Sequence, residues 1–188
     1  VYIINHAEDR YIFVDLTFVP LLEAILPHIG NVEGFIILCD EDKMPETKLP
    51  NALCYETLLA AESDEFEWPE FAETKGASMC YTSGTTGNPK GVLYSHRSTI
   101  LHAWAGCAKD VIGLSSTDTV LAVVPMFHIS AWGLVYSSAM MGSKLVMPGP
   151  GLDGKNLTDM IRAEEVTLMA GVPTVWLGIL NHLREVGG

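Results

Sequence analysis

The sequence has few basic side chains and no grouped cysteines. It contains 11 lysine and arginine residues against 23 aspartate and glutamate residues, which gives a formal net charge of −12. Without a positively charged stripe, neither nucleic acid nor an anionic membrane is expected as a partner. The four cysteines stand far apart, with no C-x-x-C pair and no histidine at metal-ligand spacing, so neither a zinc site nor a disulfide framework is predicted. We expect reduced cysteines in a cytoplasmic protein.

A signal-peptide pattern is also missing at the N-terminus. Charged residues are absent from Thr119 to Ser143, and this run is long enough to raise the question of a membrane span. Pro125 and His128 interrupt it, and Pro125 would break a continuous helix. We therefore expect a buried strand followed by a buried helix, and no transmembrane segment.

The remaining composition is that of a folded domain. The chain has 188 residues, of which 48% are hydrophobic, and this suffices for a sizeable core. Tyr11–Val14 and Phe35–Cys39 are apolar runs of strand length, and the apolar residues between Phe18 and Ile29 recur at helical spacing. Such a β-α-β unit predicts parallel strands with a right-handed crossover. The predicted fold class is α/β, with layered, mostly parallel sheets flanked by helices.

Later segments continue the alternation of strands and helices. A short helix is expected at residues 52–61, and residues 63–74 read as an acidic linker whose aromatic side chains pack on a neighbouring surface. Ser95 is a suitable N-cap for a helix that ends near Gly113, with Trp104 in its buried stripe. Further strands are predicted at residues 120–124, 144–147 and 167–170, and further helices around residues 136–141, 157–161 and 175–183.

Glycine and hydroxyl side chains gather between Thr82 and Gly91, in the order T-S-G-T-T-G-N-P-K-G. Glycine permits positive φ, so backbone N–H groups can close on an anion, while hydroxyls add donors and Lys90 adds positive charge. The spacing differs from a Walker A loop, because Pro89 precedes Lys90 and Gly91 follows it. No G-x-G-x-x-G fingerprint occurs either. The apolar, β-prone residues on both sides predict a phosphate-binding loop between two strands.

From Met79 to Lys90 the chain resembles the signature loop of the adenylate-forming superfamily, which includes acyl-CoA synthetases, luciferases and peptide-synthetase adenylation domains. The resemblance implies that this loop binds the phosphates of ATP. It also implies that Thr82 shares a Mg²⁺ site whose other protein ligand lies outside the segment. The implied ATP-binding residues are Thr82, Ser83, Gly84, Thr85, Thr86, Gly87 and Lys90.

A second informative stretch is Pro125–Gly133, in which His128 and Trp132 follow a predicted strand end, at the mouth of an expected cavity. Taken alone, such side chains are more often structural. The run P-M-F-H with a nearby tryptophan is, however, similar to that of fatty acyl-CoA synthetases. The similarity implies that His128 lies beside the substrate carboxylate, as a catalytic residue, and that Trp132 stands at the entrance of the acyl tunnel.

A third stretch starts the last predicted helix. In the family, the segment that corresponds to Gly171, Val172, Pro173 and Thr174 lines the acyl pocket. A Gly-Pro helix start needs no function, so the residues themselves leave both alternatives open. If the helix after His128 begins at Ile129, the side chains of His128 and Trp132 fall on nearly the same face and share a cavity wall.

The resemblance covers nearly the whole chain but only part of a complete member. It implies a fragment of an ATP-dependent medium- or long-chain fatty acid–CoA ligase that uses ATP, Mg²⁺ and CoA and is a possible homodimer. The fragment alone is expected to be inactive, because the ribose-binding aspartate, a magnesium-site glutamate and the C-terminal catalytic lysine lie outside it. Residues 1–76 are expected to be scaffold, and residues 77–188 to carry the loop and the acyl pocket of the same incomplete N-terminal domain.

Three alternatives share the phosphate loop. An adenylating enzyme that loads a carrier-protein thiol would differ in its C-terminal sequence. A ligase for aryl or short-chain acids, including sulfur-containing acids, would differ around Trp132 and Val172. A non-catalytic binding protein of the same fold would lack the catalytic lysine.

Overall fold

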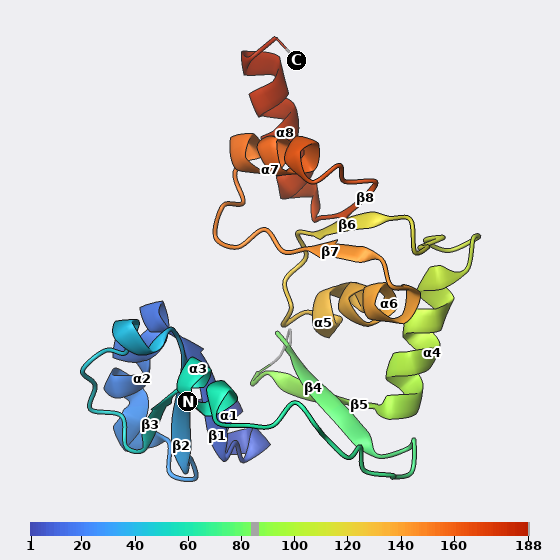
Figure 1. The fold of residues 1–188 in the computed structure, drawn as a ribbon. Coiled ribbons are helices and arrows are strands. Elements are labelled where there is room, and N and C mark those ends of the chain that lie inside the picture. Colours follow the sequence, from blue (N-terminus) through green and yellow to red (C-terminus); the bar gives the residue numbers. More distant parts are fainter. Residues whose placement is uncertain (84–86, 188) are drawn as a thin grey trace. The chain divides into compact units, whose positions relative to one another are not determined.

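The structure is a computed structural model that describes residues 1–83 and 87–187 (Figure 1). The predicted loop residues Gly84, Thr85 and Thr86 lie outside the described residues. The chain divides into two compact units. The first holds Val1–Glu70 together with residues 87–89, and the second holds Phe71–Ser83 and the chain from Lys90 onward.

The first unit is built on a parallel sheet of strands β1 (Tyr11–Asp15), β2 (Gly34–Leu38) and β3 (Ala52–Cys54), in that order. Its helices are α1 (Tyr2–Ala7), α2 (Val19–Ile25) and α3 (Tyr55–Ala60), with short 3-10 turns at Leu16–Phe18, Leu26–His28 and Glu41–Lys43. The predicted parallel β-α-β unit between residues 11 and 39 is therefore confirmed. Phe35 and Ile37 of the middle strand are fully buried, because Val19 and Leu22 of α2 pack in the same cluster.

Two sequence predictions for this region need correction. The helix predicted at residues 52–61 begins only at Tyr55, since residues 52–54 pair with β2 as the third strand. The aromatic side chains of the acidic linker do not all pack on a neighbouring surface. Trp68 is 83% exposed and contacts only Phe66 edge-on among the described aromatic rings, whereas Phe71 lies against His96 at a centroid distance of 4.5 Å.

The second unit begins with an antiparallel hairpin of β4 (Gly76–Thr82) and β5 (Lys90–Ser95), which leads directly into α4 (His96–Cys107). The predicted cap of α4 is confirmed. The Ser95 hydroxyl accepts a hydrogen bond from the Ser98 N–H at 3.1 Å, and the Ser98 hydroxyl accepts one from the Ser95 N–H. This reciprocal arrangement satisfies backbone donors that a helix start leaves free.

A second parallel sheet, in the order β7-β6-β8, forms the rest of this unit. Its strands are β6 (Thr119–Ala122), β7 (Lys144–Val146) and β8 (Leu168–Ala170), and its helices are α5 (Ile129–Trp132), α6 (Leu134–Met141), α7 (Gly154–Ala163) and α8 (Pro173–Glu185). Figure 1 shows α6 on one side of this sheet and α7 with α8 on the other. The predicted α/β class with mostly parallel, helix-flanked sheets is confirmed.

The central strand β6 is buried on both faces. Val120 and Ala122 pack in one cluster with Leu134 of α6, whereas Leu121 packs in another with Leu157 of α7. Successive side chains of a strand point to opposite faces, and a strand covered on both faces is therefore a continuous apolar run. Burial of this strand inside the protein therefore explains why the run contains no charged residues, and a membrane span is not needed to explain it. In the described part of the chain, no helix is long and apolar enough to cross a membrane.

The start of β6 is joined to the start of β8 by Asp118. Its carboxylate accepts hydrogen bonds from the Thr167 hydroxyl at 2.7 Å and from the N–H and hydroxyl of Ser115. These donors, Thr167 first, stabilise the charged form and hold the pKa of Asp118 below its ordinary value.

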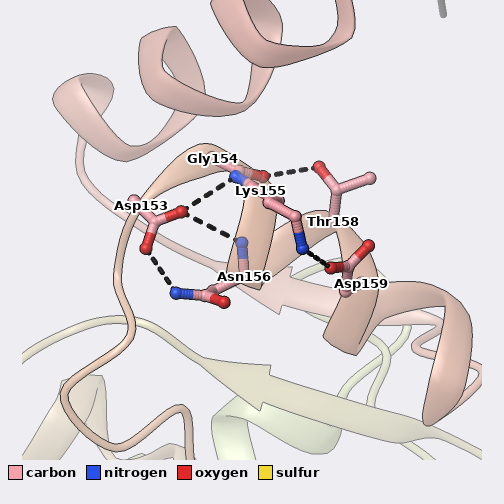
Figure 2. Close-up of polar contacts among 6 residues, drawn as sticks. All are labelled: Asp153, Gly154, Lys155, Asn156, Thr158 and Asp159. Atoms are coloured by element: carbon pink, nitrogen blue, oxygen red, sulfur yellow. Dashed lines mark hydrogen bonds and ion pairs between the residues drawn. The ribbon is translucent and has the colours of Figure 1, made fainter. Parts of the chain in front are cut away.

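Helix α7 is fixed at its N-terminus by side-chain hydrogen bonds (Figure 2). The Asp153 carboxylate accepts from the N–H groups of Lys155 and Asn156, both at 3.1 Å, and from the Asn156 amide. Gly154 lies so close to α8 that a Cβ there would stand 2.2 Å from the carbonyl oxygen of Gly178. A glycine at position 154 thus permits the two helices to pack.

The apolar residues of two helices are buried only in part. Trp104, expected in the core, is 68% exposed, and the buried residues of α4 are Ala103 and Gly106. This helix turns its small side chains toward α6, because the Ser137 hydroxyl lies 3.1 Å from the Ala103 carbonyl oxygen. In α8, whose apolar residues recur at helical spacing, Ile179 is buried, while Trp176 and Leu180 are exposed.

Candidate functional site

The glycine-rich loop joins the two strands of the hairpin, as predicted. Thr82 and Lys90 are paired in the ladder and form its last rung before the loop. Both side chains are exposed, as is Ser83. Gly87 has φ of 116°, a conformation that favours glycine. Among the described residues the Lys90 ammonium group has no hydrogen-bond or ion-pair partner, so its charge is available to an anion.

The other two predicted segments lie at the carboxyl ends of neighbouring strands. Pro125–Gly133 follows β6 and Gly171–Thr174 follows β8, and these strands are parallel partners. The chain leaves β6 toward α6 on one face of the sheet and leaves β8 toward α8 on the other. In open α/β sheets, such a reversal creates a crevice beyond the strand ends where ligands bind.

The backbone after His128 makes an unexpected left-handed turn. His128 is extended, with φ of −102°, and the next four residues, Ile129–Trp132, have φ between 42° and 57°. The Gly133 N–H donates to the Ile129 carbonyl at 3.1 Å and closes the turn. A face shared by His128 and Trp132 was expected only if a helix begins at Ile129. A helical turn does begin there, but its φ values are positive, so the side-chain spacing of a right-handed helix does not apply to these two residues. His128 is exposed and Trp132 is 38% exposed.

This turn forms part of the wall of two hollows within the second unit. The first, of about 280 Å³, lies between the hairpin, α4 and the turn, and is lined by hydroxyl, imidazole and small apolar groups: Ser78, Tyr94, Ser98, Thr99, His102, Ile129, Ser130, Gly133 and Tyr136. The second, of about 370 Å³, is lined by Trp132 together with His102, Ile129 and apolar residues that include Val111 and Ile112. The structure thus brings Ser130 and Trp132 to different hollows.

The third segment is held by α8. The Trp176 indole N–H donates to the Gly171 carbonyl at 2.9 Å. Val172 is the N-cap of α8 and Pro173 stands in its first turn, where proline needs no N–H partner. Val172, Pro173 and Thr174 are exposed, so their side chains remain accessible at the end of β8.

A complete metal site is not formed by the described residues. They contain no group of three or more histidine, cysteine, aspartate or glutamate side chains that could hold an ion. Thr82 offers a hydroxyl oxygen, the kind of ligand that Mg²⁺ prefers. The role of Thr82 as one ligand of a shared Mg²⁺ site stays a prediction.

Sequence reasoning missed His102. Its position on α4, six residues from His96, gave no reason to expect a ligand or a structural partner. In the structure its ring contacts the turn that bears Trp132, a residue far along the chain. The hydroxyl residues Ser78 and Tyr94 were likewise not predicted as site residues, although they line the first hollow.

Comparison with known proteins identifies the family. Residues 1–187 match the family model described as AMP-binding enzyme. The chain belongs to this AMP-binding family. The predicted membership in the adenylate-forming superfamily is thereby confirmed.

Several relatives of the chain are named as acid–CoA ligases. The chain is 49% identical over 187 residues to a 3-methylmercaptopropionyl-CoA ligase of Ruegeria lacuscaerulensis, covering 100% of this chain and 35% of that protein. It is 48% identical over 179 residues to a medium-chain fatty acid–CoA ligase of Ectopseudomonas oleovorans, covering 95% of this chain and 33% of that protein. The chain thus spans about a third of the length of the curated relatives it matches.

A solved structure is similar over the same extent. The long-chain fatty acid–CoA ligase from Archaeoglobus fulgidus matches with a TM-score of 0.79 at 25% identity, covering 97% of this chain and 34% of that chain. The fold of this chain is therefore similar to that of part of this ligase.

Proposed function

We propose that the full-length protein containing this segment is an ATP-dependent acid–CoA ligase that acts on medium- or long-chain fatty acids. The observation that carries the proposal is the family match over residues 1–187, combined with a glycine-rich loop closed by Thr82 and Lys90 on a hairpin. An exposed ammonium group and several hydroxyl groups at one loop suit a polyphosphate ligand.

In the first step of the proposed reaction, a carboxylate oxygen of the acid attacks the α-phosphorus of ATP. The new bond gives an acyl-adenylate, and the bond to the bridging oxygen of pyrophosphate breaks with its electron pair. In this proposal, Lys90 and the loop donors stabilise the negative charge that develops on pyrophosphate. His128 is proposed to donate a hydrogen bond to the acid carboxylate and thereby to orient it.

A Mg²⁺ ion bound with the nucleotide would neutralise phosphate charge in this step. Thr82 would contribute one hydroxyl ligand, and the remaining ligands would come from phosphate oxygens, water and residues beyond the segment.

In the second step, the CoA thiol attacks the acyl carbonyl, loses its proton and displaces AMP to form the thioester. In this proposal the 188-residue chain contributes the phosphate loop and part of the acid pocket. We propose that the chain does not catalyse the reaction by itself, because the family resemblance implies further binding and catalytic residues outside it.

A second candidate function is the activation of a short sulfur-containing acid. It is favoured by the 49% identity to a 3-methylmercaptopropionyl-CoA ligase, which is close to the identity with the medium-chain ligase. The two candidates share the loop chemistry and differ only in the acid.

ATP–pyrophosphate exchange by the full-length protein tests both candidates. The panel comprises octanoate, palmitate, 3-methylmercaptopropionate and benzoate, with Mg-ATP constant. Exchange that depends on octanoate or palmitate supports the first candidate, and exchange only with 3-methylmercaptopropionate supports the second. Exchange with none of the acids contradicts adenylation and favours a binding protein of this fold.

A further inference from the structure

The turn at Ile129–Trp132 requires support from its surroundings. Four consecutive L-residues, one of them β-branched, adopt positive φ. In this region the Cβ atom approaches the following carbonyl oxygen, so each such residue raises the free energy of the folded chain. Conformations of this kind persist where neighbouring groups over-determine them, and they cluster at functional sites. Neighbouring groups are therefore expected to hold the turn in this conformation.

His102 of α4 is one of these groups. Its Nε2 lies 3.1 Å from the Trp132 carbonyl oxygen. A carbonyl oxygen can only accept, so Nε2 carries the hydrogen and donates it. The same ring packs against Gly133, where an added Cβ would stand 2.6 Å from the imidazole Cδ2. Gly133 also has φ of 74°, so this position combines a left-handed backbone with contact to a ring.

A second contact fixes the residue after the turn to the same pair of helices. The Ser137 hydroxyl of α6 lies 3.1 Å from the carbonyl oxygens of Gly133 and Ala103, and its hydrogen can be shared between them. Gly106 of α4 permits this approach, because a Cβ there would lie 3.2 Å from the Ser137 hydroxyl oxygen. Helices α4 and α6 are thus in direct contact beside the turn, and His102 of α4 joins the turn to this pair.

His102 also lies between the two hollows. It and Ile129 belong to the walls of both, while Ser130 lines only the first and Trp132 only the second. The imidazole therefore contributes to the partition between a hydroxyl-lined space and a more apolar one. A movement of this ring would change the position of Trp132 and the shape of both hollows together.

We infer that His102 is a positioning residue for acid selection: it holds the left-handed turn, and with it Trp132, so that the partition between the two hollows limits which acids fit. The inference rests on the proposed function, in which an acid binds at Trp132. His102 itself contacts the protein backbone and is not assigned a chemical step.

The first test measures the placement of Trp132 in the 188-residue chain, without any substrate. Nitrogen-15 spectra resolve the indole signals, and a Trp132→Phe variant assigns the relevant one. His102→Gln retains a donor at similar reach, His102→Asn retains a donor that is too short, and His102→Leu removes it. We expect the Trp132 signal to shift in the Asn and Leu variants and to remain near its wild-type position in the Gln variant.

His96→Leu is the matched control, because His96 lies on the same helix but packs against Phe71 with the two rings tilted by 45°. It should leave the Trp132 signal unchanged. An unchanged Trp132 signal in both His102→Asn and His102→Leu would overturn the inference. Because the Asn variant is polar and small, it remains informative if the Leu variant does not fold.

The second test measures acyl-adenylate formation by the full-length protein over acids of increasing length. His102→Asn should change the preferred length and lower kcat/KM for the best acid by about fivefold to tenfold, the size expected for one lost hydrogen bond, while KM for ATP stays constant. His102→Gln should restore the wild-type profile. An equal loss for every acid in both variants, together with a lower Tm, would show that His102 is only structural.

The outcomes separate this inference from the proposed function. If the wild-type protein adenylates no acid, the proposed function fails and acid selection fails with it, while the indole spectra still decide whether His102 places Trp132. If acids are adenylated but His102→Asn has the same chain-length profile as wild type, the proposed function is supported and the role of His102 in acid selection is contradicted.

Discussion

Strand β6 and the hairpin β4–β5 are both rich in apolar residues. Other parts of this chain bury β6, whereas much of the apolar surface of the hairpin stays exposed. Leu121 in β6 is 0% exposed, between helices on both faces, whereas Leu93 in β5 is 63% exposed. The hairpin nevertheless carries the glycine-rich loop at its end. Burial and proposed chemistry are thus separated in this unit: β6 forms part of its core, and the hairpin carries the groups that we propose to bind the phosphates.

The largest expected effect is a loss of activity without a loss of stability. Lys90→Ala in the full-length protein should slow acyl-adenylate formation by roughly 10²–10³-fold, as for removal of one preorganised charge-stabilising donor. Tm should not change, because Lys90 is exposed and unpaired among the described residues. The measurements are ATP–pyrophosphate exchange and thermal unfolding.

Thioester formation from supplied acyl-adenylate should be retained in Lys90→Ala, since pyrophosphate has already left. Lys109→Ala, another exposed lysine of the second unit, is the control and should behave as wild type. An equal loss in both half-reactions would contradict the assignment of Lys90 to the phosphates.

The second largest expected effect is a loss of stability, caused by a substitution in β6. Leu121→Ala removes a fully buried side chain and should lower the free energy of unfolding by about 2–5 kcal/mol. Leu93→Ala on the hairpin is the matched substitution and should change it by less than about 0.5 kcal/mol. Urea denaturation of the 188-residue chain measures both. Similar losses at the two positions would mean that the hairpin is covered in solution and that the comparison does not hold.

A smaller effect is expected where α7 meets α8. Gly154→Ala places a methyl group against the Gly178 carbonyl, which is backbone and cannot rotate away, so we expect a loss of about 1–3 kcal/mol. Gly178→Ala is the control, and it is expected to raise the stability where Gly154→Ala lowers it. Its Cβ would find its nearest neighbour at 3.9 Å, and replacing a helical glycine should stabilise by up to about 1 kcal/mol. Equal changes in the two variants would show that the helices separate readily.

The smallest expected effect concerns pH. The pKa of Asp118 is lowered from 3.8 in the folded chain, mainly by the Thr167 hydroxyl, so its stabilising contribution is fully present above the unfolded value and is lost as pH falls through the folded value. Asp118→Asn should therefore lower Tm at neutral pH, and this difference should shrink below a pH of about 4. Asp110→Asn, at an exposed residue, is the control. A Tm difference between wild type and Asp118→Asn that grows on acidification would contradict a lowered pKa of Asp118.

Periodicity and capping residues predicted most elements of the fold. The strand at Tyr11, the parallel partner at Phe35 and the cap at Ser95 all depend on local sequence, and all three are present in the structure. The burial of Trp104 was predicted wrongly, because an apolar stripe identifies a helix face but not what covers it. Within this segment α6 approaches the opposite, small-residue side of α4 instead.

The candidate site was predictable only in part. The loop from Thr82 to Lys90 could be placed between strands, because glycine, hydroxyl and apolar residues signal it directly. The left-handed turn after His128 could not, since Ile129–Trp132 contains no glycine or asparagine to indicate positive φ. The contact of His102 with this turn depends on the tertiary packing of α4 against α6, which no local pattern encodes.

The central position of β6 also has a consequence for how the chain folds. Its two neighbours come later in the sequence, and Val120 pairs with Leu145 on one side and with Leu168 on the other. Until both neighbours are in place, an uncharged, β-prone run from Val120 to Val124 has unpaired edges. Non-local parallel pairing is slow to form and exposes such segments to aggregation. The central strand that helps to stabilise the finished unit is therefore also prone to aggregate before its neighbours are synthesised.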